Sequence, residues 1–461
     1  MNYDFDINDD NLLECLKNNK LGRNSRINNL LKLINILKRN TIISIDGQWG
    51  CGKTVFVKQI ELINKKYYTD NINLAKQSSL DEETIKTFNE NHIVYYYNAW
   101  ENDNHLDPLK SIIYKIINDY PNEKNQTTDG NIQIPLNFKN FLKTTTNDLF
   151  DVDKVVSYKD LVKKIYTVEE QQEALNKLID SIIPKDKKIV IIVDELDRCN
   201  PNFAVKLIET VKHFYTNNKI IFLMVSNNSQ LSHTVSKFYG EKFDGYGYLN
   251  KIYDLIVNLE NVDVNTYLKN VVGRIDEGNF KDVASYEFCK YYNFSMREIN
   301  RYIYTIDLLH DYCNNFDSFR DNMVLKYLFL PYCLALKIKN GHIFNEFIGG
   351  KNIDDFKKIM NSSKKILNIV NIIIKNDKSI SDEEVDLNTY IENVYNEYFN
   401  NVLENEYFKQ KVKNIFMEAV SLISNYSSIN WYLKKYTKSN NECKFSGFII
   451  SFSASSIYVR I

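Results

Sequence analysis

The chain contains the octapeptide Gly47-Gln48-Trp49-Gly50-Cys51-Gly52-Lys53-Thr54. This stretch fits the phosphate-binding pattern G-x-x-x-x-G-K-[ST] at every defined position. Its glycines permit positive φ angles and allow backbone N–H groups to approach phosphate oxygens without a Cβ in the way. We expect Lys53 to reach the β- and γ-phosphates of a nucleotide, and Thr54 to ligate Mg²⁺.

The segments on either side of the octapeptide favour this interpretation. Residues 41–46 are a short, mostly β-branched run, which predicts a buried strand, and residues 55–63 can continue as a helix. The amino-terminal end of such a helix adds a partial positive charge beside the phosphates. The alternative is a glycine-rich turn with a chance lysine, but that alternative does not require a flanking strand and helix. All eight residues from 47 to 54 are therefore predicted to bind nucleotide.

The composition is that of an ordinary globular chain. Of its 461 residues, 44% are apolar and 25% are charged, and the net charge of −1 gives no nucleic-acid signature. The seven cysteines are scattered without a C-x-x-C pair, which fits a reducing cytosol, and the amino terminus has no signal-peptide core. No window approaches the roughly 18 apolar residues of a membrane span. The composition thus predicts a cytoplasmic protein without a transmembrane segment.

Apolar runs alternate with helical patterns across the first part of the chain. Besides residues 41–46, the expected strands are residues 92–97, 188–194, 220–226 and 253–259. This alternation predicts an α/β fold, in which a doubly wound parallel sheet of about five strands binds its ligand at the carboxyl ends of the strands. The pattern becomes mainly helical after the sheet.

The expected organisation has four parts. These are a helical lead-in (residues 1–40), a nucleotide-binding core (41–261), a helical lid or subdomain (262–340) and a helical C-terminal region with a terminal hairpin (341–461). The core is expected to carry a helical insertion at about residues 101–187, whose broken amphipathic pattern predicts that it does not cross a membrane. Residues 65–91 are polar and are predicted to be a surface excursion.

Two acidic residues end the most hydrophobic expected strand. Asp194 can hold Mg²⁺ through water, and Glu195 can polarise the water that attacks the γ-phosphate. An Asp-Glu pair can also begin a loop or cap a helix, but the phosphate loop upstream favours catalysis. Asp197 and Arg198 follow, either as a structural pair or with Arg198 contacting phosphate or a neighbouring subunit.

Two further polar residues are candidates at the edge of the site. Asn227 follows the strand at residues 220–226 and can either sense the γ-phosphate or serve as the N-cap of a helix beginning near Ser229. Arg297 belongs to a helix after the sheet and can either close over the nucleotide from a lid or lie on a solvated helix face.

Several blocks of the sequence, taken together and in order, resemble the KAP family of P-loop NTPases. The resemblance covers about residues 20–310 and rests on these blocks: Leu21-Gly22-Arg23, Gly47 to Thr54, Asn98-Ala99-Trp100, Asp194 to Cys199, Tyr248 to Ile252, and Ser295 to Arg301. The chain departs from the family pattern at three positions. Asn227 and Asn250 replace common acids, and Met296 stands where a proline often precedes the arginine.

The resemblance implies a Mg²⁺-dependent ATPase whose hydrolysis drives a switch, with a role in phage defence or stress signalling. A protein partner is expected to bind the helical C-terminal region, while peripheral membrane association and self-association stay open. The rival interpretation is a scaffold that binds ATP with little turnover, for which Glu195 has no use. A small-molecule kinase would need an acceptor pocket and a basic lid, and the sequence has no motif for either.

Overall fold

The chain forms two compact units in its computed structural model, residues 1–304 and residues 305–461, and the division falls within helix α15 (Met296–Tyr312). The structure describes residues 6–69, 78–105, 107–108, 111–112, 115–116, 186–213, 218–274, 278–312, 319–377 and 386–399. Most of the predicted insertion and the predicted terminal hairpin lie outside these residues.

The first unit is built on a sheet of five parallel strands in the order β2-β3-β4-β1-β5. The strands are β1 (Thr41–Asp46), β2 (His92–Asn98), β3 (Lys188–Asp194), β4 (Ile220–Ser226) and β5 (Leu255–Asn258). Every residue of β4 and nearly every residue of β3 is buried, because helices cover both faces of a parallel sheet. The predicted α/β parallel sheet is confirmed.

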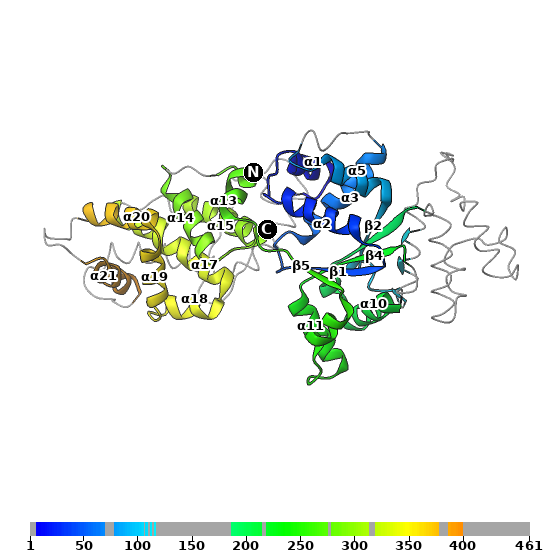
Figure 1. Cartoon of the computed structure of the whole chain (residues 1–461). Helices are drawn as coiled ribbons and strands as arrows, with labels where there is room; N and C mark the ends of the chain where they lie inside the picture. The colour runs from blue at the N-terminus through cyan, green and yellow to red at the C-terminus, as the bar shows by residue number, and fades with distance from the viewer. Residues whose placement is uncertain are drawn as a thin grey trace, which may run out of the picture. The chain divides into compact units, whose positions relative to one another are not determined.

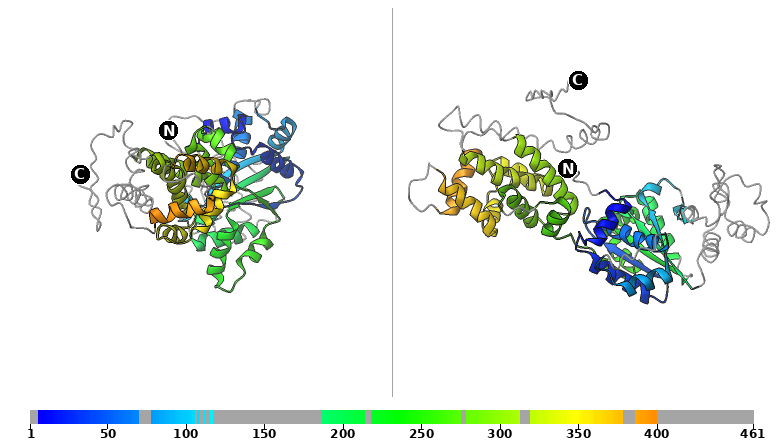
Figure 2. Two further views of the ribbon diagram at one scale, coloured as in Figure 1. Left: turned by 90° about the vertical axis from the view of Figure 1, so that its left-hand side faces the viewer. Right: turned by 90° about the horizontal axis from the view of Figure 1, so that it is seen from above.

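Helices lie on both faces of this sheet. Figure 1 shows α1, α2, α3 and α5 on one side and α10 and α11 on the other, and Figure 2 gives two further views. Among the described residues, the α- and π-helices of the unit are α1 (Asp9–Lys17), α2 (Asn24–Ile36), α3 (Lys53–Thr69), α5 (Glu82–Asn91), α10 (Pro201–His213), α11 (Asn228–Tyr239), α12 (Gly245–Ile252), α13 (Val264–Tyr267), the π-helical η5 (Leu268–Val272), α14 (Phe280–Tyr291) and the first part of α15.

The strand order brings three loops to one edge of the sheet. β4 lies between β1 and β3, and Asp46 pairs with Ser226 while Asp194 pairs with Val225. The chain therefore leaves β1, β3 and β4 at neighbouring points of the carboxyl edge. The phosphate loop follows β1, the acidic pair ends β3, and Asn227 follows β4, so all three candidate segments converge.

The predicted surface excursion at residues 65–91 is wrong in its second half. Residues 82–91 form α5, which buries Ile85, Phe88 and Asn89. The Nδ2 of Asn64 in α3 donates to Asn89 Oδ1 at 2.8 Å. Because α5 has few apolar positions, its polar composition did not predict a helix. Hydrogen bonds between buried side-chain amides help to stabilise it.

The second unit is helical in the part that the structure describes. An aromatic cluster forms its core and includes Phe329, Tyr332, Phe347, Phe356 and Tyr395. Its helices are the remainder of α15, α16 (Phe319–Val324), the π-helical η6 (Leu325–Phe329), α17 (Leu330–Lys339), α18 (Gly341–Ile348), α19 (Asp354–Ser362), α20 (Lys364–Lys375) and α21 (Leu387–Phe399).

No helix within the described ranges is long and apolar enough to cross a membrane. The most apolar stretch considered from the sequence, within α20, instead buries one face through Ile366, Ile369, Val370 and Ile373.

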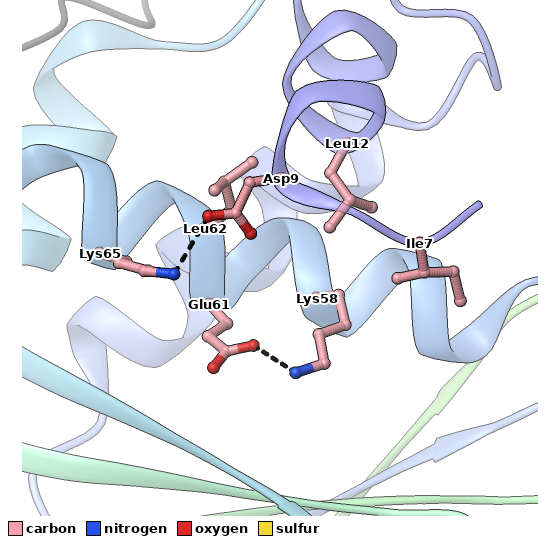
Figure 3. A pocket seen from close by; sticks show the side chains of 7 residues that line it. All are labelled: Ile7, Asp9, Leu12, Lys58, Glu61, Leu62 and Lys65. Carbon is pink, nitrogen blue, oxygen red and sulfur yellow. Dashed lines mark hydrogen bonds and ion pairs between the residues drawn. The ribbon is translucent and has the colours of Figure 1, made fainter. Parts of the chain in front are cut away.

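A small cavity of about 130 Å³ lies between α1 and α3 (Figure 3). Two lysines and two acids line it, and they pair with one another: Lys58 with Glu61 at 2.7 Å, and Lys65 with Asp9 at 3.0 Å. Because these charges are matched within the lining, the cavity offers no excess charge to an ionic ligand.

Candidate nucleotide site

The phosphate loop has the backbone that its glycines predict. Gly50 and Gly52 have φ angles of +83° and +94°, in the region that side chains disfavour. Helix α3 begins at Lys53, so its first N–H groups face the loop. Lys53 is 9% exposed, and its Nζ donates to the carbonyl oxygens of Gly47 at 2.6 Å and Gln48 at 3.3 Å. The loop therefore curls around an ammonium group.

The acid at the end of β3 lies against the start of α3. Asp194 is 1% exposed, and burial raises its pKa, although hydrogen bonds from Thr54, from the amide of Glu195 and from Tyr96 oppose this shift. Tyr96 Oη donates to Asp194 Oδ2 at 3.0 Å, and Lys58 Nζ lies 3.3 Å from the centre of the Tyr96 ring. Tyr96 is a site residue that the sequence analysis missed, because nothing distinguishes it from the tyrosines on either side.

Glu195 lies close to Thr54 and is paired with a cation. Thr54 Oγ1 donates to Glu195 Oε1 at 3.4 Å, and the Nε of Arg198 forms an ion pair with Glu195 Oε2. Burial, followed by the charge of Asp194, raises the pKa of Glu195, and Arg198 opposes the shift. Glu195 also has a left-handed backbone, with φ of +62°, which is uncommon for a residue other than glycine and is frequent at functional sites.

Arg198 connects this carboxylate to the segment after β2. Its guanidinium lies 5.5 Å from the centre of the Trp100 ring, within reach of a cation–π contact. The structure shows Arg198 paired with Glu195, a partner that the sequence analysis did not consider, rather than with Asp197.

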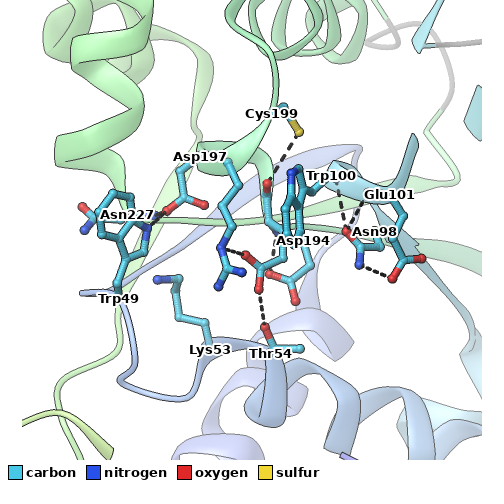
Figure 4. A network of polar contacts seen from close by, with 12 residues as sticks. Trp49, Lys53, Thr54, Asn98, Trp100, Glu101, Asp194, Asp197, Cys199 and Asn227 are labelled. Atoms are coloured by element: carbon cyan, nitrogen blue, oxygen red, sulfur yellow. Dashed lines mark hydrogen bonds and ion pairs between the residues drawn. The ribbon is translucent and has the colours of Figure 1, made fainter. Parts of the chain in front are cut away.

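Asp197 joins two other segments instead. Its Oδ2 accepts a hydrogen bond from Trp49 Nε1 at 2.6 Å and another from the amide of Asn227 at 2.9 Å (Figure 4). One carboxylate oxygen thus holds the phosphate loop and the tip of β4.

Asn227 is the N-cap of α11. Its side chain accepts from the amide of Gln230 at 3.3 Å, which is the structural alternative of the two considered from the sequence. Its backbone N–H donates to Asp197, so Asn227 lies at the carboxyl edge of the sheet, where the three candidate segments converge. Contact with a nucleotide stays a prediction.

The beginning of α15 packs on the phosphate loop. Ser295 Oγ accepts from the amide of Glu298 at 3.4 Å, and Glu298 Oε2 accepts from the amide of Ser295 at 2.8 Å, which is a capping box. A Cβ added at Gly50 would lie 2.9 Å from the Cβ of Arg297, and one added at Gly52 would lie 2.1 Å from the Cε of Met296. The exposed Arg297 is therefore positioned next to the loop by a well-capped helix.

Arg23 is a second residue whose place the sequence analysis did not predict. It is 5% exposed, and its guanidinium donates to the carbonyls of Glu260, at 2.5 Å, and Gly52, at 3.5 Å. Burial lowers its pKa to about 10. Arg23 fixes the end of the phosphate loop to the segment after β5, and its only sequence signal was its place in the Leu21-Gly22-Arg23 block.

The residues at this edge fit a magnesium ion. No group of three or more His, Cys, Asp or Glu side chains that could hold a metal occurs among the described residues. Mg²⁺ in nucleotide sites rarely needs such a group, because one or two carboxylates complete a shell made largely of phosphate oxygens and water. The hydroxyl of Thr54 and the carboxylate of Asp194 are hard oxygen ligands of that kind.

A parallel sheet with a glycine-rich phosphate loop after β1 and an acid at the end of the strand two places away defines a P-loop NTPase. The model of the KAP family P-loop domain matches residues 23–320, and the chain belongs to that family. No curated protein matches the chain. The family resemblance inferred from the sequence is confirmed, and with it a role in nucleotide binding.

Proposed function

We propose that the protein is a Mg²⁺-dependent ATP hydrolase that acts as a nucleotide-driven switch. The observation that carries the proposal is the convergence of Thr54, Asp194 and Glu195 beside the phosphate loop. Thr54 approaches Glu195 at 3.4 Å, and Asp194 is buried next to Glu195 in the chain. A module that only binds a nucleotide has no need of the second acid.

Each residue has a separate task in this proposal. The amides of residues 47–54 and the ammonium of Lys53 bind the phosphates, while Thr54 and Asp194 hold the metal. Mg²⁺, when bound, neutralises charge that develops on the phosphate oxygens. Glu195 orients and polarises the attacking water, and the raised pKa of its carboxyl brings it closer to the pH range in which a general base works best. Arg297, beside Gly50, can contact the γ-phosphate.

The pairing of Glu195 with Arg198 favours slow basal turnover. The guanidinium of Arg198 opposes the rise in the pKa of Glu195 and directs the carboxylate away from other partners. This observation supports the second candidate function, an ATP-binding scaffold with little turnover. In the switch proposal the same pair is a resting state that a partner of the helical C-terminal region releases.

The wider role is proposed from the family. We place the protein in the cytoplasm, with ATP as its nucleotide, and assign it to phage defence or stress signalling. The described residues contain no helix suited to cross a membrane, and association with a membrane surface or with further copies of the chain stays open.

Phosphate release from ATP and from GTP by the purified full-length chain, with Mg²⁺ or with EDTA, tests the proposal. We expect release from ATP that requires Mg²⁺, and a higher Mg²⁺ requirement in Asp194→Asn. Tight ATP binding without release under any condition would support the scaffold instead.

A further inference from the structure

Trp49 and Asp197 are motif residues to which the proposed hydrolysis assigns no task in catalysis. Trp49 belongs to the phosphate loop, yet its side chain is 48% exposed and contributes little to the core. Asp197 lies one turn after the acidic pair, in the 3₁₀ helix η3 (Leu196–Arg198). The two residues are 148 positions apart in the sequence and meet through a 2.6 Å hydrogen bond.

This hydrogen bond has the properties of a strong one. The acceptor is a carboxylate, and charge-assisted hydrogen bonds are shorter and stronger than neutral ones. The same oxygen, Asp197 Oδ2, is fixed from the other side by the amide of Asn227 at 2.9 Å. Asp197 is thereby anchored to the end of β4, a buried central strand, and can in turn hold the indole of Trp49 in place.

The contact ties the middle of the loop to η3, outside the loop, whereas Gln48 O accepts from the amide of Cys51 at 3.2 Å and from Lys53 Nζ at 3.3 Å within the loop. The amide of Gly47 donates to Ser226 O at 3.3 Å, which ties the start of the loop to β4. Arg23 holds the other end at Gly52. Trp49 lies between these two anchors and next to Gly50, which has positive φ and no side chain to restrict it.

We propose that Trp49 and Asp197 form a clasp that holds the phosphate loop in its nucleotide-binding shape, so that Asp197 is a positioning residue acting through Trp49. A loop that contains three glycines in six residues samples many conformations, and ordering it on binding costs free energy. A contact that orders the loop beforehand removes part of that cost and raises affinity. This inference rests on nucleotide binding at the proposed site.

The clasp should influence affinity much more than folding. Removing the indole N–H leaves the sheet and its helices intact, because Trp49 is half exposed and stands outside the core. The phenylalanine variant keeps an aromatic ring at the position and loses only the donor.

The test measures the affinity of the full-length chain for a non-hydrolysable ATP analogue with Mg²⁺ by calorimetry. We expect Trp49→Phe and Asp197→Ala each to raise Kd about tenfold, which corresponds to losing about 1.4 kcal/mol from one charge-assisted bond. The double variant should bind no more weakly than the weaker single variant, since both remove the same contact. Asp197→Asn should recover part of the affinity, because its side-chain oxygen can still accept both donors but carries no charge. Thermal unfolding of each variant confirms that it is folded.

Trp100→Phe is the matched control. Trp100 is the other exposed tryptophan of this edge, at 51%, and phenylalanine preserves the ring that faces Arg198, so Kd should not change. Unchanged affinity in Trp49→Phe, additive losses in the double variant, or an equal loss in Trp100→Phe would each overturn the clasp. If the unmutated chain binds no nucleotide, the proposed site fails, and the clasp fails with it.

Discussion

Lys53 is buried among carbonyl oxygens of its own loop, at 9% exposure, and this arrangement makes it the most direct target at the scale of single residues. We expect Lys53→Ala to weaken ATP binding by about 100-fold or more, because charge-assisted bonds to phosphate contribute roughly 1.5–3 kcal/mol each. Equilibrium binding of a fluorescent ATP analogue measures the loss.

The fold should survive this substitution. The hydrogen bonds of the Lys53 ammonium are to the carbonyl oxygens of Gly47 and Gln48 in the loop itself. A melting temperature within a few degrees of the unmutated chain is the control, and retained ATP affinity in a folded Lys53→Ala protein would remove the site assignment.

Sequence reasoning proposed candidate residues for this site but did not predict the partners that the structure gives them. The loop at residues 47–54 is local in sequence, so its backbone and its role in phosphate binding follow from its glycines and lysine. The contact of Trp49 with Asp197 spans 148 positions and depends on strand order, which alternating apolar runs do not specify. Glu195 and Arg198 form an ion pair although they are only three positions apart in the sequence. This pair was not predicted, because Asp197, phosphate and a neighbouring subunit were equally reasonable partners for Arg198.

At the scale of elements, the junction between α5 and β2 depends on a neutral histidine. His92 is 2% exposed, stacks on Phe88 and contacts the carbonyl of Phe88 at 3.0 Å through Nδ1. Burial lowers its pKa to about 4, below the value near 6.5 expected in the unfolded chain. The unfolded state therefore binds more protons than the folded state between these pH values.

We expect His92 to make the free energy of unfolding fall as the pH decreases from about 6.5 to about 4, by at most about 3 kcal/mol. Denaturant unfolding across this range measures the effect. His92→Gln should flatten the dependence, whereas the matched change at the exposed His233 should not. An unchanged slope in His92→Gln would show that other groups carry the acid sensitivity.

The first turn of α15 gives the second prediction at this scale. Because Met296 and Arg297 pack against Gly52 and Gly50, ATP bound in the loop should slow amide exchange in residues 295–304. Arg297→Ala should reduce this protection and slow hydrolysis, since the guanidinium that we propose contacts the γ-phosphate is lost. Hydrogen exchange with and without ATP, with α5 as an internal reference, measures the effect. Equal exchange in both states of the unmutated chain would rule out a lid.

The bounds of helices and strands were predicted best from the sequence where one or both faces of the element are apolar. The strands at residues 41–46, 188–194 and 220–226 begin and end where their branched runs do. The helix at residues 82–91 was missed because only Ile85 and Phe88 mark its buried face, and buried amide contacts supply the remainder. The domain boundaries drawn from composition stay predictions.

At the scale of the whole molecule, the second unit has its own stabilising centre. Arg320 forms ion pairs with Asp377 at 2.6 Å and Glu397 at 2.8 Å, and the Asp377 side chain is only 2% exposed. Removing the cation from a buried pair typically costs about 3–5 kcal/mol. We expect Arg320→Ala to destabilise residues 305–399 by about this amount, as measured by denaturant unfolding followed with hydrogen exchange.

The control for this prediction is an exposed pair in the same unit. Lys357 and Glu392 are 2.7 Å apart with a half-exposed carboxylate, so Lys357→Ala should cost no more than about 1 kcal/mol. Similar losses in both variants would mean that burial does not set the strength of the Arg320 network.

The family match ends at residue 320, within the second unit. The nucleotide site therefore has the support of both the family and the fold, whereas the helical C-terminal region (residues 341–461) is assigned to a partner only by proposal. A nucleotide-driven switch needs both parts, but it first needs hydrolysis at the site in the first unit.

Phosphate release from ATP, measured in parallel for the unmutated chain and for Glu195→Gln at saturating Mg²⁺, is the most direct test of the proposed hydrolysis. Glutamine keeps the size of the side chain but cannot act as a base. We predict that the rate falls by about 10²–10⁴-fold while the affinity for ATP changes little. Equal rates of release from the two proteins would contradict the assignment of Glu195 and the hydrolytic function built on it.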